Sequence, residues 1–324
     1  MGRRPTTVIA LGGGPLTALP LYYCESLEWL IVVSGLHGFV SQMYGPAANA
    51  LLSDVVPEER RVTAFAIFRL ALNAGFAAGP AAAGVRYTRA PAFICWGDAM
   101  TTIVFAVGAF FLLPQGLRAI EGRVSSPKVV WQSWIEASRD MVANRPFLQL
   151  LLAKLFRAVA FARAFNVLAI DTNARGISPF DYGLIMGFDG ALIVGIELPL
   201  VSWIKQFPAR RVLVVGFVLV GLGCASFAFA ATLPGFFIAM SIYTLGEMIS
   251  LPVSAAYSAR LAPARFRGRY FGYMSLAWGI AALAGSAGVW AYRVWGTSGW
   301  IWSECFGLIA GGMMIPFFLD RRPK

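Results

Sequence analysis

Residues 210–231 read RRVLVVGFVLVGLGCASFAFAA, two arginines followed by an uncharged apolar run that continues to Ala231. A helix of about 20 apolar residues crosses the hydrocarbon core of a bilayer, so this stretch predicts a transmembrane helix. The whole chain of 324 residues has this character: 58% are hydrophobic and 13% are charged. A soluble globular domain has about 25% charged residues. The composition therefore excludes a soluble enzyme, a disordered chain and a secreted disulfide scaffold, and predicts an all-α polytopic membrane protein.

Similar apolar segments recur from one end of the chain to the other. The first follows Arg3 and Arg4, as a signal peptide would, but Tyr22-Tyr23-Cys24 does not supply a small-residue cleavage site, so we interpret it as a span. Glycines and prolines at 12–15 and 20 interrupt it, which makes it the least regular of the set. We expect ten transmembrane helices, at about residues 6–24, 29–52, 62–85, 91–114, 147–170, 181–204, 210–231, 235–258, 268–292 and 299–319.

The Lys and Arg residues that give the chain its net charge of +11 are distributed unevenly between the two sides of the predicted spans. With the N-terminus inside, nineteen Lys and Arg residues fall at the inner side of the spans, and the outer side holds only Arg86, Arg89, Arg175 and Arg293. Positive residues concentrate on the cytoplasmic side of membrane proteins, so both termini are predicted to be cytoplasmic. This distribution leaves no excess charge for a nucleic-acid partner.

The four cysteines lie far apart, and the sequence has no Cys/His cluster. No metal, cofactor or redox motif is therefore expected. No nucleophile–base set or phosphate loop is present either, so the chain is not expected to be an enzyme.

The long polar stretch 115–146 separates the fourth and fifth spans. Apolar residues between Val130 and Val142 recur at near-helical spacing, with charged residues between them. We interpret this stretch as a cytoplasmic connector with a helix on the inner membrane surface. A plain connecting loop is the alternative.

Three features of the chain repeat at nearly the same separation, which indicates two related halves. Shifts of 207, 206 and 204 residues relate Arg4 to Arg211, Pro57 to Pro263, and Gly75 to Gly279. The second half holds six spans and the first holds four, so about 60 residues and two spans are missing from the first half by this offset. We expect residues 1–114 to form a partial N-terminal bundle, 115–146 the connector and 147–324 a complete six-helix bundle, an arrangement of 4+6 helices instead of 6+6.

These motifs resemble the major facilitator superfamily, whose two six-helix halves are joined by a long cytoplasmic loop. The segment Gly2-Arg3-Arg4-Pro5 resembles the end of the family's G-x-L-a-D-r-x-G-R-R motif between helices 2 and 3, and Ser53–Arg61 resembles the end of helix 4 and the loop after it. Arg69-x3-Asn73-x-Gly75-x3-Gly79-Pro80-x3-Gly84 resembles the helix-5 motif of the family's antiporters, with Ala83 in place of one glycine. Leu245–Pro252 and Ala262–Gly272 resemble helix 10 and the following loop of drug:proton antiporter-like members.

The resemblance implies a fold of two helix bundles and roles for two sets of residues. Small residues let helix backbones approach closely, and Pro80 bends its helix. The resemblance therefore implies that one set of residues packs helix 5 closely against a neighbouring helix and so takes part in gating: Arg69, Asn73, Gly75, Gly79, Pro80 and Gly84. Generic tight packing without a gating role is the alternative. A cytoplasmic latch between the halves is implied for Arg3, Arg4, Arg60, Arg61, Arg267 and Arg269, with a role as topology anchors as the alternative.

Charged residues inside the predicted spans are costly, so they are expected to be paired or functional. Two consecutive antiparallel spans carry them at matching depths: Arg163 is expected to face Asp189, and Lys154 or Arg157 is expected to face Glu197. Such pairs either only hold the helices together or exchange partners during proton transfer.

Glu247 lies near the middle of span 235–258, with no cation within a turn on its own helix. In the resembled family this helix borders the central cavity, so Glu247 is the favoured proton-binding residue; a structural hydrogen bond to a backbone carbonyl is the alternative. Arg69 is expected to bind an acid of the missing helices or to close the inner gate.

The sequence therefore predicts a secondary transporter that exports small amphipathic or drug-like molecules in exchange for protons by alternating access. A metabolite transporter on the same fold and a non-transporting fragment without its first two helices are the alternatives. The expected partners are a small-molecule substrate, protons and the lipid bilayer. The expected location is the plasma membrane, as a multi-pass and monomeric protein of a bacterial inner membrane.

Overall fold

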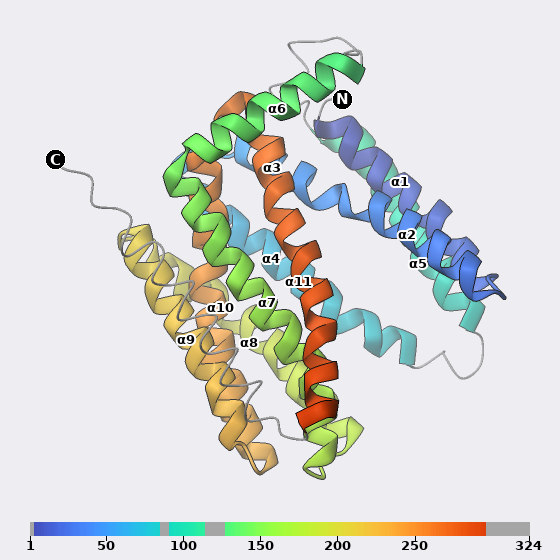
Figure 1. Ribbon diagram of the computed structural model, residues 1–324, viewed down its shortest axis with the longest axis vertical. Helices are drawn as coiled ribbons and strands as arrows, with labels where there is room; N and C mark the ends of the chain where they lie inside the picture. Colours follow the sequence, from blue (N-terminus) through green and yellow to red (C-terminus); the bar gives the residue numbers. More distant parts are fainter. Residues whose placement is uncertain (1–2, 85–90, 114–126, 296–324) are drawn as a thin grey trace. The chain divides into compact units, whose positions relative to one another are not determined.

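The computed structural model describes residues 3–84, 91–113 and 127–295, and all regular structure in these ranges is helical (Figure 1). Helices lie over every predicted span up to residue 292, and the predicted span 299–319 lies outside the described residues. The helices are α1 Arg3–Tyr22, α2 Leu27–Gln42, α3 Tyr44–Val55, α4 Arg61–Gly84, α5 Pro91–Leu112, α6 Pro127–Ala143, α7 Arg145–Ala174, α8 Pro179–Ile204, α9 Ala209–Phe229, α10 Leu233–Leu261 and α11 Arg267–Trp295.

Four of the described helical stretches are long and apolar enough to cross a membrane by length and composition alone. They are Phe180–Ile204, Ala209–Phe229, Leu233–Leu261 and Ala264–Val294. A shorter apolar helix covers Trp96–Leu112.

The predicted span 29–52 is not one helix, because it breaks at Met43. Helix α2 ends at Gln42 and α3 begins at Tyr44. Pro46 has no backbone N–H, and its ring would collide with the carbonyl group four residues earlier, that of Gln42. The break therefore occurs where an uninterrupted helix would place this collision.

Helix α1, by contrast, runs unbroken through the glycines and prolines of the first predicted span. The Thr17 hydroxyl group bonds to the carbonyl oxygens of Gly13 and Gly14 at 3.0 and 2.9 Å. His37 of α2, the single histidine of the chain, lies 3.1 Å from the same hydroxyl oxygen through Nδ1. This polar contact joins α1 to α2.

The connector contains helix α6 over 127–143, so its second part is helical rather than a plain loop. Its location at a membrane surface stays a prediction.

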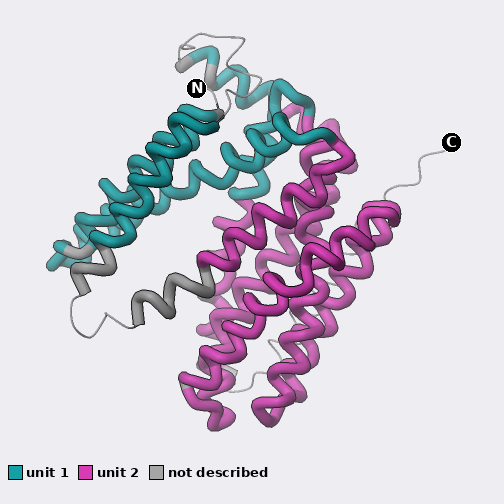
Figure 2. The backbone as a smooth tube through the Cα atoms, turned by 180° about the vertical axis from the view of Figure 1, so that it is seen from behind, with its two compact units in different colours: residues 1–57, 78–137, 263–275 teal, residues 58–77, 138–262, 276–324 magenta. Residues whose placement is uncertain are grey.

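The chain forms two compact units that interleave along the sequence (Figure 2). Unit 1 contains residues 1–57, 78–137 and 263–275, and unit 2 contains residues 58–77, 138–262 and 276–324. In unit 1, α1 packs against α5 and α2, and Leu11 is buried with Ala106 and Ala109. In unit 2, α10 packs against α9, α8 and α7.

Glycines bring the backbones of α9 and α10 into direct contact. A Cβ atom at Gly223 would lie 2.5 Å from Cα of Tyr243, and one at Gly246 would lie 2.5 Å from the backbone nitrogen of Val220. Gly216 is equally confined, since its Cβ would lie 2.6 Å from Cβ of Ser250. Real Cβ atoms do not approach other atoms so closely, so only glycine allows this contact. The contact fixes the position of the α10 residues that carry the polar site.

Candidate ion-pair network

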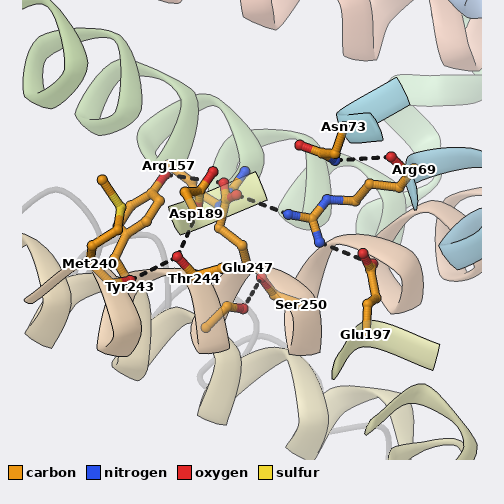
Figure 3. A network of polar contacts seen from close by, with 11 residues as sticks. Arg69, Asn73, Arg157, Asp189, Glu197, Met240, Tyr243, Thr244, Glu247 and Ser250 are labelled. Atoms are coloured by element: carbon orange, nitrogen blue, oxygen red, sulfur yellow. Dashed lines mark hydrogen bonds and ion pairs between the residues drawn. The ribbon is translucent and has the colours of Figure 1, made fainter. Parts of the chain in front are cut away.

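Arg69 of α4 connects two buried carboxylate groups of unit 2 (Figure 3). Its Nη1 atom lies 3.0 Å from Oε1 of Glu197 on α8, and its Nη2 atom lies 2.9 Å from Oε2 of Glu247 on α10. Glu197 is fully buried and Glu247 is 7% exposed. Asn73, one turn further along α4, donates from Nδ2 to the Arg69 carbonyl oxygen at 2.9 Å. One guanidinium group therefore joins three helices at two separate acids.

Glu247 has two further partners besides Arg69. Arg157 of α7, 3% exposed, forms an ion pair with its Oε1 atom. The Tyr243 hydroxyl group, one turn earlier on α10, donates to the same oxygen at 3.1 Å. Both contacts with Arg157 and Arg69 are charge-assisted, because an Arg guanidinium group keeps its charge under all conditions of interest.

Asp189 of α8 has a different environment. Its Oδ1 atom lies 2.6 Å from the Thr244 hydroxyl oxygen, and among the described residues this is its one hydrogen-bond or ion-pair partner. The same hydroxyl oxygen lies 2.7 Å from the carbonyl oxygen of Met240, one turn earlier on α10. A hydroxyl group carries one proton, so Thr244 donates to only one of these two oxygens at a time.

The two arrangements of this proton differ in the states of Asp189 that they allow. When Thr244 donates to Oδ1 of Asp189, the acceptor is either an oxygen of the ionised carboxylate group or the carbonyl oxygen of the protonated carboxyl group. When Thr244 donates to Met240, the short contact to Asp189 is a hydrogen bond only if Asp189 supplies the proton. The geometry therefore accommodates both the ionised and the protonated carboxyl group.

The pairs that we expected from the sequence are not those observed. Glu197 binds Arg69 rather than Lys154 or Arg157, Arg157 binds Glu247, and Asp189 contacts Thr244 rather than Arg163. The reason is packing: α8 contacts α10 more extensively than it contacts α7, although α7 and α8 are consecutive. The acids that Arg69 binds in the described part of the chain come from α8 and α10.

Two predicted cations of α7, Lys154 and Arg163, belong to none of these pairs. Lys154 lies one turn before Arg157 and is partly buried. Arg163 lies against α11, where a Cβ atom at Gly288 would lie 3.2 Å from its Cγ atom.

Helix α4 is continuous through Gly79, Pro80 and Gly84 to its end. A Cβ atom at Gly75 would meet no described atom within 4 Å, in contrast to the glycines at which α9 and α10 touch. The side chains from residue 76 to the end of this motif lie outside the described residues.

Among the described residues, four of the six predicted latch arginines have a partner within their own unit: Arg4, Arg61, Arg267 and Arg269. In unit 1, Arg267 forms an ion pair with Asp54 at the end of α3, 2.6 Å from Nη1 to Oδ1, and Arg269 lies over the Trp134 ring of α6 at 5.7 Å. In unit 2, Oε2 of Glu58 lies 4.0 Å from Nη1 of Arg61, and Oε1 of Glu58 lies 3.9 Å from Nε of Arg260. Arg60 is exposed, Arg4 contacts α5, and Arg3 begins α1.

Sequence reasoning missed Thr244 as part of the site. Its spacing from Glu247 by three residues, and that of Tyr243 by four, places both on the face of α10 that carries Glu247. This spacing was the one available signal.

Comparisons with known proteins identify the kind of protein that this site belongs to. A model of the Major Facilitator Superfamily matches residues 1–196 and again residues 150–324, so the two matches cover the whole chain. A relative from Planococcus maritimus, named Na(+), Li(+), K(+)/H(+) antiporter, is 23% identical over 93% of this chain and 76% of its own length. The multidrug resistance protein MdtH of Edwardsiella ictaluri is 23% identical over 82% of this chain and 65% of its own length.

Solved structures show the same fold. The human organic anion transporter MFSD10 superposes with a TM-score of 0.79 over 98% of this chain and 77% of its own, at 17% sequence identity. A bacterial homologue of the iron transporter ferroportin, in an outward-facing state, superposes with a TM-score of 0.72 over 99% of this chain and 84% of its own, at 15% identity. At these identities the likeness concerns the fold.

Proposed function

Since the chain belongs to the Major Facilitator Superfamily of membrane transporters, we propose that it exports small amphipathic or drug-like molecules in exchange for protons, by alternating access. The names of two relatives support this direction, because one is a cation/proton antiporter and another a multidrug resistance protein. The buried carboxylates of the ion-pair network supply the groups that such coupling requires.

The observation that carries the proposal is the position of the Thr244 hydroxyl group between Asp189 and the Met240 carbonyl oxygen. It provides a hydrogen bond to Asp189 in both protonation states, so a proton can arrive or leave without breaking the contact between α8 and α10. We therefore assign the proton to Asp189 rather than to Glu247, whose carboxylate group binds two guanidinium groups.

The charge of Asp189 influences the rest of the network. When ionised, Asp189 attracts the guanidinium group of Arg69 and repels the carboxylate of Glu247. Protonation removes both interactions, and charges act over longer distances in a low-dielectric interior than in water. The proton therefore changes how strongly α4, α8 and α10 are held together through Arg69, which is the change that alternating access requires.

The test is a transport assay with the purified full chain in liposomes that carry a pH gradient. Ethidium serves as a lipophilic cationic substrate, and internal pH is followed with an enclosed dye. We expect ethidium to dissipate the gradient with the wild-type chain, and Asp189→Asn and Thr244→Val to abolish this coupling while ethidium still binds. Asp181→Asn, in the first turn of α8, is the matched control and should behave as wild type.

Each of four results would contradict the proposal. Unchanged proton movement in Asp189→Asn would remove Asp189 from coupling. Ethidium movement that is independent of pH, or the absence of any transport, would contradict proton-coupled export by this chain. Dissipation by NaCl, LiCl or KCl but not by ethidium would replace export of organic molecules by cation/proton exchange.

We further propose ten transmembrane segments arranged as 4+6, with both termini in the cytoplasm of a bacterial cell. The division at 1–114, 115–146 and 147–324 assigns α1 to α5 to the first bundle and α7 to α11 to the second. The repeat offset and the distribution of Lys and Arg support this arrangement. Labelling of single cysteines at residues 59 and 176 from outside intact cells tests it, because only the second is expected to react.

A further inference from the structure

Unit 1 contains an apolar groove along α1 and α5. The groove has a volume of about 400 Å³, and the side chains that line it are all apolar. Val8, Gly12 and Leu16 form the α1 side, while Ile103, Val107 and Phe111 lie on the α5 side. Residues spaced by four on a helix share one face, so the α1 side is a straight strip of roughly 12 Å.

Gly12 produces the hollow in this strip. A Cβ atom at Gly12 would meet no atom within 4 Å, so the missing side chain leaves open space rather than room for a neighbouring helix. The glycines of α9 differ in this respect, because other backbone atoms occupy the space where their side chains would lie. Beneath the groove, Leu11 packs against Ala106 and Ala109, so the two helices are joined on the buried side.

A cation lies at one end of the groove. Arg4, in the first turn of α1, donates from Nη2 to the carbonyl oxygen of Phe110, and Phe110 also lines the groove. The Arg4 guanidinium carbon lies 5.1 Å from the centre of the Phe110 ring. The Phe110 carbonyl is among the last four of α5, which have no partner within the helix. This contact holds the charge at the groove end, and a guanidinium group has five N–H donors in all.

We propose that this groove binds an anionic phospholipid, with one acyl chain along α1 and α5 and the phosphate group at Arg4. The apolar strip matches a hydrocarbon chain, and the arginine matches a phosphate, to which guanidinium groups donate in a bidentate geometry. A chain of a membrane transporter family presents such a surface to lipid, and basic residues at the membrane surface attract anionic headgroups. All the residues involved belong to unit 1, so the proposal is independent of the coupling site in unit 2.

The test is native mass spectrometry of the purified full chain titrated with phosphatidylglycerol or phosphatidylcholine. We expect wild type to bind phosphatidylglycerol about fivefold more tightly, the ratio that corresponds to about 1 kcal/mol for one basic residue. Arg4→Gln should remove this preference, and Arg4→Lys should keep it because the charge remains.

A second pair of variants tests the groove itself. Gly12→Leu fills the hollow without a collision and should lower the affinity for both lipids. Gly35→Leu is the control, because it makes the same change on α2, where a Cβ atom also meets nothing within 4 Å. Val107→Trp narrows the groove from the α5 side and should lower the affinity for both lipids as Gly12→Leu does. If one of these two variants does not fold, the other still tests the groove.

Three outcomes would overturn the proposal. Equal affinity of wild type for both lipids would remove the role of Arg4. Unchanged binding in Gly12→Leu and Val107→Trp would remove the role of the groove. Competition by inorganic phosphate alone, with no dependence on the groove variants, would show a free-anion contact at Arg4 instead of a phospholipid site.

Discussion

Two carboxyl groups of unit 2 lie close to the same stretch of α10 and differ in what holds them. Glu247 binds two guanidinium groups and a tyrosine hydroxyl group, whereas Asp189 binds one threonine hydroxyl group among the described residues. Removing one member of a buried ion pair is costly, but a hydrogen bond to a neutral hydroxyl group adapts to either protonation state. The difference suggests that Glu247 fixes the helices in place and that Asp189 is the group free to change its charge.

The largest effect is expected when the Glu247 cluster is broken. Arg157→Met removes one of the two cations, and loss of one partner of a buried pair costs about 3–5 kcal/mol of unfolding free energy. Unfolding in mixed micelles at increasing SDS fraction measures this loss. The double variant Arg157→Met/Glu247→Gln should recover part of it, because it also replaces the buried carboxylate group, which after the single change has lost one of its two cationic partners. A single variant as stable as wild type would show that Arg157 does not hold Glu247.

A smaller loss is expected from the contact that positions Tyr243 for Glu247. Gly223→Ala places a Cβ atom 2.5 Å from Cα of Tyr243, so α9 and α10 must move apart. Overpacking of this kind costs about 1–3 kcal/mol. Gly75→Ala is the matched control, since its Cβ atom has open space and alanine favours a helix by about 0.5–1 kcal/mol over glycine. Equal stability of the two variants in the same SDS titration would contradict the observed contact.

The smallest effect on stability is expected at Asp189. Asp189→Asn keeps an oxygen that accepts from Thr244, so the unfolding free energy should change by less than about 1 kcal/mol. The same variant is expected to abolish proton coupling, which separates its role from that of Glu247. A stability loss as large as that of Arg157→Met would instead assign Asp189 to the structural cluster.

The helices of this fold could be predicted from the sequence, because uninterrupted apolar runs are a local property of the chain. The break at Met43 was missed, since the run 29–52 contains no Asp, Glu, Lys or Arg and only Pro46 signals the interruption. The helical connector between 127 and 143 followed from its apolar spacing. The helices, the break at Met43 and the helical connector are all determined by residues that lie within a few turns of each other.

The partners in the site could not be predicted in the same way. Arg69 and Glu197 are separated by 128 residues, and Arg157 and Glu247 by 90. Matching depth in consecutive helices does not determine which helices touch, because α8 packs mainly on α10. The sequence identified the charged members of the network, Glu247, Glu197, Asp189, Arg69 and Arg157, but their pairing depends on the packing of α4 and α10.

The glycines between α9 and α10 also restrict how this sequence can drift over evolutionary time. Every replacement of glycine adds at least one carbon atom, so no neutral exchange exists at Gly216, Gly223 or Gly246 while the backbones touch. Glycines with open space, such as Gly183 and Gly187 on α8, have no such restriction. Substitutions among descendants of this chain should therefore accumulate on the open faces of α8 before they reach the contact between α9 and α10, which holds Tyr243 and Glu247 in place.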